Sequence, residues 1–139
     1  MPNSGELERI RLKTRRLVTE QKALVQTLLR LREHLGGSLI VRWAECGKEG
    51  CACQRGDRHG PYYILSNRSG GQGGYTYLQE PQVARARDLV QRHRRFQDGL
   101  RRLKRINEGL VVALRRYREA AGRRGLRTLG REQSQKAVV

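Results

Sequence analysis

A short cysteine-rich segment constrains the fold of this chain more than any other feature. It reads CGKEGCACQRGDRHGPYY over residues 46–63 and holds all three cysteines, Cys46, Cys51 and Cys53, with His59 close behind. Three thiols and an imidazole on a loop broken by glycines form a donor set that suits tetrahedral Zn²⁺. The sequence therefore predicts a zinc site at Cys46, Cys51, Cys53 and His59.

The fourth ligand is the least constrained part of this site. Asp57 lies close to His59 in the sequence, and His34 precedes the loop, so either side chain could replace the imidazole of His59. The Cys-x-Cys spacing is tighter than the usual Cys-x2-Cys knuckle, and the alternative is a small apolar knot with incidental thiols. Because little in the sequence supplies an open metal position with a nearby base, we expect no enzymatic activity.

Composition and charge limit the class of protein further. The 139 residues carry a net charge of +17 with 37% hydrophobic and 5% aromatic residues, which predicts one elongated unit with a thin core. A charge of this size attracts polyanions, so we expect nucleic acid as the partner, DNA in preference to RNA. No apolar segment matches a secretory signal or a membrane span, so we expect a cytoplasmic protein without membrane contact, in which the thiols stay reduced.

Two long segments have the period of helices that pack along one another. Apolar residues recur at alternating intervals of three and four in residues 3–35, which begin at a possible Asn3 cap and end at Gly36, and again in residues 81–121. The second segment is the longer, so a second copy of the chain could cover its free end. The first predicted seam is Leu7, Ile10, Thr14, Leu17, Gln21, Leu24, Leu28, Leu31 and Leu35, and the second is Ala86, Leu89, His93, Phe96, Leu100, Leu103, Asn107, Leu110, Leu114 and Tyr117.

Residues 36–80 change to the period of strands. A strand over 39–43 leads into the cysteine loop, and strands over 62–65 and 75–78 form a hairpin about the glycine-rich turn at 69–74. So small a sheet needs the metal to fold. The predicted fold is therefore α+β and mostly α: an antiparallel coiled-coil helical hairpin with a small three-stranded zinc-knuckle insert at its tip.

Basic residues concentrate in the second helical segment. Residues 81–121 carry twelve Lys/Arg against four Asp/Glu, whereas residues 36–80 carry five against four. Residues 122–139 are also basic but lack an apolar period, so we expect a disordered tail there. Arginine pairs recur at intervals of seven and fourteen residues in two columns outside the seam. Arginine binds phosphate oxygens bidentately, so a regular stripe suits a nucleic-acid backbone, although a solvated helix face is the alternative. The predicted nucleic-acid contacts are Arg87, Arg94, Arg95, Arg101, Arg102, Arg115 and Arg116.

Aromatic residues gather around the cysteine loop. We expect the hairpin tyrosines to pack within the sheet, with base stacking as the alternative. We expect Trp43 in the core beneath the metal loop, and His93 as a tolerated seam residue in place of a metal ligand. The hairpin tyrosines are Tyr62, Tyr63, Tyr75 and Tyr77.

The central segment resembles an uncharacterised family of small prokaryotic proteins. The matching motifs are CGKEGCAC at residues 46–53 and HGPYY at 59–63, and the lead-in at 37–43 is similar as well. The resemblance covers residues 36–120 and implies a domain of unknown function with a two-strand hairpin, a long charged helix and a link to mobile elements or transposases. That hairpin is basic in the family, whereas the turn here reads Gly-Gly-Gln-Gly-Gly.

Two functions fit these patterns. The first is a zinc-stabilised protein that grips the phosphates of nucleic acid with its arginines. The alternative is a coiled-coil interaction module, either a homodimer or an accessory subunit of a recombinase-type or transposase-type complex.

Overall fold

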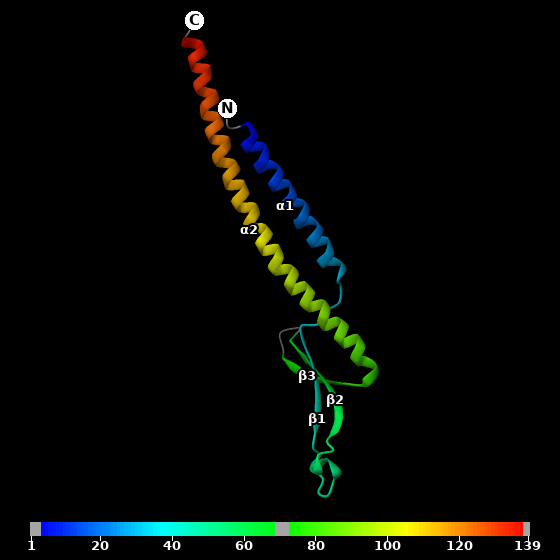
Figure 1. Cartoon of the computed structure of the whole chain (residues 1–139). Helices are drawn as coiled ribbons and strands as arrows, with labels where there is room; N and C mark the ends of the chain where they lie inside the picture. The colour runs from blue at the N-terminus through cyan, green and yellow to red at the C-terminus, as the bar shows by residue number, and fades with distance from the viewer. Residues whose placement is uncertain (1–3, 69–72, 138–139) are drawn as a thin grey trace. The chain divides into compact units, whose positions relative to one another are not determined.

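The computed structural model describes residues 4–68 and 73–137. This part of the chain is mostly helical with one three-stranded antiparallel sheet, so the predicted α+β, mostly α class is confirmed. The expected Asn3 cap and most of the hairpin turn, residues 69–72, lie outside the described residues. In chain order the elements are α1 (Ser4–Arg30), β1 (Gly37–Ala44), the short 3₁₀ helix η1 (Ala52–Arg55), β2 (His59–Asn67), β3 (Gly74–Leu78) and α2 (Glu80–Ala137) (Figure 1).

The chain divides into two compact units. One comprises Met1–Thr27 with Gly99–Val139, and the other comprises Leu28–Asp98, so that α1 and α2 each contribute residues to both. Within residues 4–68 and 73–137, no helix is long and apolar enough to cross a membrane.

In the first unit, α1 and α2 run antiparallel and are joined by ion pairs. Arg123 donates to the carboxylate of Glu6 at 3.1 Å, and Arg102 donates to that of Glu20 at 2.9 Å. Glu6 precedes Glu20 on α1, whereas the partner of Glu6 on α2 follows the partner of Glu20. The two helices therefore run in opposite directions.

The seam of α1 lies where the sequence predicts it. Every predicted position from Leu7 to Leu35 is buried or half-buried, and Glu6 is the one other described residue of α1 with reduced exposure. The three-and-four spacing alone was sufficient to predict the buried face of α1. The polar residues between the seam positions are nearly all charged or amide-bearing, so they mark the exposed face clearly.

The seam of α2 is rotated by one residue from the predicted one. Ile106, Ala113 and Ala120 are 6%, 3% and 3% exposed, whereas the predicted seam residues Leu100 and Leu114 are 46% and 55% exposed. The prediction is therefore wrong at Leu100, Asn107 and Leu114, whereas the predicted seam residues Leu103, Leu110 and Tyr117 are half-buried.

Small residues on α2 explain the rotation. A Cβ built on Gly109 would meet Leu17 Cδ1 at 3.6 Å, so the leucine of α1 reaches the α2 backbone at this glycine. Small residues allow such close approach, while Leu100 and Leu114 turn outward. Asn107, predicted on the seam, is exposed and accepts a hydrogen bond from Gln21 at 2.7 Å.

In the second unit, α1 ends at Arg30, earlier than the predicted end at Leu35. Arg32 takes a φ of 51°, in the left-handed region that interrupts a right-handed helix. The N–H of Leu35 donates to the carbonyl of Leu89 on α2 at 3.1 Å, so the connection takes its backbone partner from α2 in place of a further helical turn.

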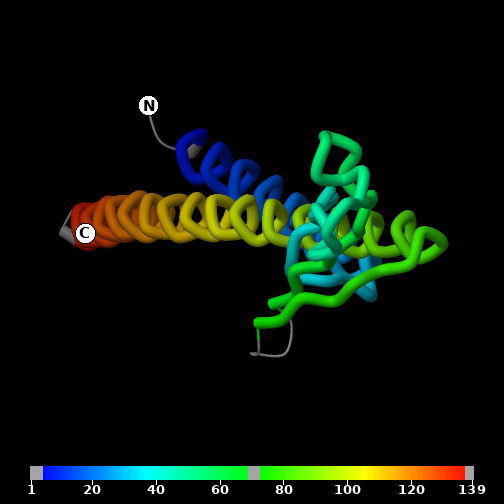
Figure 2. Tube along the Cα trace, turned by 90° about the horizontal axis from the view of Figure 1, so that it is seen from below, coloured from blue at the N-terminus to red at the C-terminus, as the bar shows by residue number. Residues whose placement is uncertain are grey.

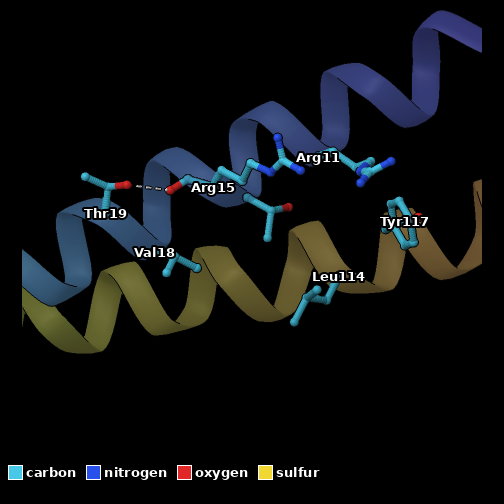
Figure 3. A pocket seen from close by; sticks show the side chains of 7 residues that line it. Arg11, Arg15, Val18, Thr19, Leu114 and Tyr117 are labelled. Atoms are coloured by element: carbon cyan, nitrogen blue, oxygen red, sulfur yellow. Dashed lines mark hydrogen bonds between the residues drawn. The ribbon is translucent and has the colours of Figure 1, made fainter.

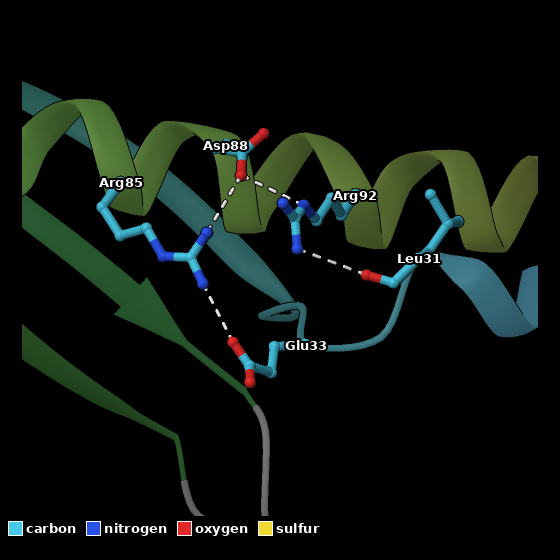
Figure 4. Close-up of polar contacts among 5 residues, drawn as sticks. All are labelled: Leu31, Glu33, Arg85, Asp88 and Arg92. Carbon is cyan, nitrogen blue, oxygen red and sulfur yellow. Dashed lines mark hydrogen bonds and ion pairs between the residues drawn. The ribbon is translucent and has the colours of Figure 1, made fainter.

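Side chains of α2 hold the same connection. Arg92 donates to the carbonyl of Leu31 at 3.4 Å and pairs with Asp88 at 3.0 Å (Figure 4). Arg85 bridges Asp88 at 3.3 Å and Glu33 at 2.9 Å. These contacts fix the entry into β1.

The sheet is a meander with the order β1-β2-β3. Leu39 of β1 pairs with Leu65 of β2, and Ile64 of β2 pairs with Tyr77 of β3, so the three predicted strands and their antiparallel hairpin are confirmed. The buried apolar residues of this unit are Leu28, Cys53, Ile64, Leu65, Val83, Ala86 and Val90.

The predicted disordered tail is wrong for residues 122–137, which continue α2, while residues 138–139 lie outside the described part. Gly122 does not end the helix. Between the glycines the segment consists mainly of arginine, leucine, glutamine and glutamate, which are good helix formers, and it lacks proline. Arg123 is also held by its ion pair with Glu6.

Candidate metal centre and nucleic-acid interface

The four predicted metal ligands come together in the loop that joins β1 to β2. Cys46 follows the end of β1, Cys51 caps the N-terminus of η1, Cys53 lies within η1, and His59 begins β2. Figure 2 shows this loop curling back on itself beyond the strands. The left-handed φ of 113° at Gly56 makes the return toward His59 possible, since glycine adopts it without strain.

The donor atoms are close enough to share one metal ion. The Sγ atoms of Cys46 and Cys53 lie 3.4 Å apart, and Cys51 Sγ lies 3.2 Å from His59 Nε2. All four donor atoms lie within 4.8 Å of one another. Tetrahedral zinc would place its ligand atoms about 3.5–3.8 Å apart, so the arrangement fits this ion after small adjustments.

The surroundings of the thiols set their pKa values apart. Hydrogen bonds to the sulfur, chiefly from the backbone N–H of Cys53, lower the pKa of Cys51 to about 6. Burial raises the pKa of Cys53 to about 11, and its side chain is fully enclosed. The backbone N–H of Cys46 donates to Cys53 Sγ at 3.3 Å, a contact that persists when sulfur is a metal ligand.

Neither alternative fourth ligand joins the cluster. Asp57 is exposed and lies outside the group of donor atoms. His34 Nδ1 lies 2.9 Å from Nδ1 of His93, and its ring stacks on Phe96 with centroids 5.2 Å apart. His59 is therefore the fourth donor that the geometry supports.

Trp43 does not lie in the core as predicted. Its side chain is 52% exposed. The register shifts between Arg42 and Ala44, which marks a bulge at Trp43, and bulges redirect side chains. The indole ring lies against Gly60, where an added Cβ would come within 3.1 Å of Trp43 Cε3.

The predicted arginines all lie on α2 with exposed side chains, but they are not equivalent. The shifted seam brings Arg102 beside α1, where it pairs with Glu20, so it does not lie away from the seam as predicted. Those in the second unit are Arg87, Arg94 and Arg95, and those in the first are Arg101, Arg102, Arg115 and Arg116.

The sequence patterns did not indicate that basic residues of α1 line a groove. Arg11 and Arg15 line a groove with Leu114 and Tyr117 in the first unit (Figure 3). Figure 3 places both guanidinium groups along α1 above the rim formed by α2. The excess of basic residues in α1 was the available signal, but their irregular spacing hid which of them face α2.

The hairpin tyrosines are less enclosed than predicted. Tyr75 and Tyr77 are 74% and 69% exposed, and Tyr62 is 43% exposed. Tyr63 is the half-buried exception. Packing within the sheet was therefore the wrong expectation for most of them.

Comparison with known proteins places the chain in a family without an assigned activity. The family model described as "Domain of unknown function (DUF6788)" matches residues 7–88, which include the metal cluster and the sheet. The expectation of an uncharacterised domain is confirmed, although the match begins in α1 and ends early in α2. No curated protein and no solved structure matches the chain.

Proposed function

We propose that this chain, which belongs to the DUF6788 family, is a non-enzymatic, zinc-stabilised protein that binds nucleic acid mainly through the phosphate backbone. DNA is the preferred ligand over RNA, and the cytoplasm is the compartment that would keep its thiols reduced. The observation that carries the proposal is the charge of +17 together with exposed arginines along one long helix.

Zinc has a structural role in this proposal. Cys46, Cys51, Cys53 and His59 supply four protein ligands, a number that fills a tetrahedral site and leaves no position for a reacting water. A bound ion would tie the end of β1 to the start of β2. The site thus supports a zinc knuckle over a catalytic centre.

The helices provide the binding surface. We propose that α1 and α2 pack as an antiparallel coiled coil, with the outer arginines of α2 recurring along the helix at heptad intervals. Guanidinium groups at such intervals can each contact a phosphate, and release of counterions would then drive binding.

The test is the salt dependence of duplex DNA binding by the zinc-loaded chain, measured by fluorescence anisotropy. Replacing Arg94, Arg95, Arg115 and Arg116 by alanine should weaken binding and reduce the slope of log K against log salt by roughly 3 to 4. Arg102 stays intact because its ion pair with Glu20 joins the helices.

A control variant that loses the same number of positive charges separates the effect of the arginines' position from the effect of their number. The control variant replaces Arg124, Arg127, Arg131 and Lys136, near the end of α2, by alanine, and keeps Arg123 because its ion pair with Glu6 joins the helices. Equal losses in both variants would mean that binding is spread over the whole basic surface. Failure of the unmodified protein to bind duplex DNA at low salt would overturn the proposed function.

One observation favours a second candidate, an interaction module. Leu100, Val111 and Leu114 of α2 are 46%, 47% and 55% exposed, and a second copy or the surface of a larger recombinase-type complex would bury them. Light scattering after nuclease treatment distinguishes the two. A dimer free of nucleic acid that does not bind added DNA would favour the interaction module.

A further inference from the structure

The sheet of the second unit carries an aromatic face whose residues come from two strands. Tyr62, Ile64 and Ser66 alternate along β2, so they share one side of the sheet. Tyr77 pairs with Ile64 and Tyr75 pairs with Ser66, which places both β3 tyrosines on that same side.

The rings of these tyrosines are open to solvent. Tyr75 is 74% exposed and Tyr77 is 69% exposed, while Ile64 beside Tyr77 is only 6% exposed. The aromatic rings of β3 therefore remain open to solvent beside a buried aliphatic side chain of β2. Residues two apart on a strand are about 6.6–6.8 Å apart, which gives each ring room for its own stacked partner.

The strands contribute basic residues and no acidic ones to this face. The three strands contain no aspartate or glutamate, and Arg42 pairs directly with Tyr62 across β1 and β2, on the tyrosine side. Arg68 follows β2 in the same alternation as Tyr62 and Ser66. Basic and aromatic side chains thus share one surface.

A polar pocket adjoins the row of Tyr75. Ser66, the partner of Tyr75, lines it together with Ser38, Arg68 and Gln97. The remaining lining residues are Gly36, Gly37 and His93, so the lining contains no carboxylate. Hydroxyl, amide and guanidinium donors around an open pocket suit a phosphate group.

We propose that this face, made of Tyr62, Tyr75 and Tyr77 with Arg42 and the Arg68 pocket, binds single-stranded nucleic acid by stacking unpaired bases on the tyrosines. Bases in a duplex have their ring faces occupied by neighbouring base pairs, so only a single strand can use exposed rings in this way. The inference rests on the proposed function, because it names single strands as a second ligand class of a nucleic-acid-binding chain.

The experiment compares variants of the zinc-loaded full chain for binding to a fluorescein-labelled oligothymidylate. Tyr75→Ala with Tyr77→Ala should weaken binding at least about 25-fold, since each lost stack accounts for roughly fivefold or more. Thr76→Ala is the matched control, because Thr76 lies between them on β3 and faces the other side. Tyr75→Phe with Tyr77→Phe should retain the affinity, since stacking needs the ring and not the hydroxyl.

Equal affinities of the double alanine variant and the Thr76→Ala variant would overturn the inference. A loss in the double phenylalanine variant as large as in the alanine variant would also overturn it, because the contact would then depend on the hydroxyl groups. Duplex DNA binding, measured in parallel, should be unchanged in all three variants, so the inference can fail while the proposed function stands.

A crosslinking experiment on the unmodified chain covers the case in which the double alanine variant does not fold. A single strand containing 5-iodouracil, irradiated in the complex, should crosslink to the tryptic peptide that carries Tyr75 and Tyr77. Crosslinks confined to tryptic peptides that lie wholly within α1 or α2 would refute the aromatic face as the binding site.

Discussion

The rotation of the α2 seam leads to a prediction that separates the structure from the hydrophobic pattern. Ile106 is 6% exposed, and replacing a buried isoleucine by alanine costs about 2–5 kcal/mol through lost burial and the cavity left behind. Leu114 is 55% exposed, so less than half of its full burial energy of about 1.5–3 kcal/mol is at stake. Alanine is also the better helix former, which offsets a few tenths of a kcal/mol at either position.

At the middle of these ranges, the two alanine variants should differ in stability by about 2 kcal/mol. Thermal unfolding of the zinc-loaded chain, followed by circular dichroism at 222 nm, should place the Tm of Ile106→Ala roughly 6–10 °C below that of Leu114→Ala. Leu114→Ala should remain close to the unmodified protein. If Leu114→Ala were as damaging as Ile106→Ala, α2 would present its leucines to α1 as the sequence pattern predicts, and the outward orientation derived for the arginines would be wrong.

Three further predictions concern the second unit. Cys53→Ser should reduce zinc, measured by mass spectrometry of the purified protein, from one ion per chain to nearly none, whereas retained stoichiometric zinc would contradict the site. In the metal-free protein, iodoacetamide should modify Cys51 with a half-maximal rate near pH 6, because its thiolate prevails above its lowered pKa. Cys53 should react much more slowly than Cys51 at neutral pH, because burial raises its pKa; equal rates would show that the loop loses this geometry without metal. Gly37→Ala would place its Cβ against the backbone oxygen of Ser66 and should lower the free energy of unfolding by about 1–3 kcal/mol, measured by thermal unfolding. The control Gly47→Ala, whose Cβ would have nothing within 4 Å, should change the free energy of unfolding by no more than about 0.5 kcal/mol.

Local chemistry explains which parts of the fold the sequence could predict. The metal cluster was predictable because its four donors lie within one short loop, so chain connectivity alone brings them together. The strands and the seam of α1 were predictable because their alternation of apolar and polar residues is nearly regular. In each case the determining residues are neighbours in the sequence.

The parts that failed depend on residues distant in the sequence. The seam of α2 depends on the fit of Leu17 against Gly109. A pattern of hydrophobic residues favours leucine at the seam and does not indicate that a small residue is needed where the two helices approach closely. The early end of α1 depends on α2 groups such as the carbonyl of Leu89 and the guanidinium of Arg92. Trp43 was misplaced because a bulge in its pairing with β2 changes the side chain's direction.

The charge of the chain connects the proposed functions to the stability of the fold. Thirty Lys/Arg face thirteen Asp/Glu, so ion pairs within the chain cannot neutralise the surface even if every carboxylate takes part. Several carboxylates already serve the fold, since Glu6, Glu20 and Glu33 pair with arginines of α2. Zinc bound by three thiolates and an imidazole would carry a net charge of about −1, which lowers the excess only slightly. Self-repulsion of this size destabilises a thin core, and a bound polyanion relieves it. Under the proposed function, binding of nucleic acid should therefore stabilise the helices whose arginines we propose as its contacts.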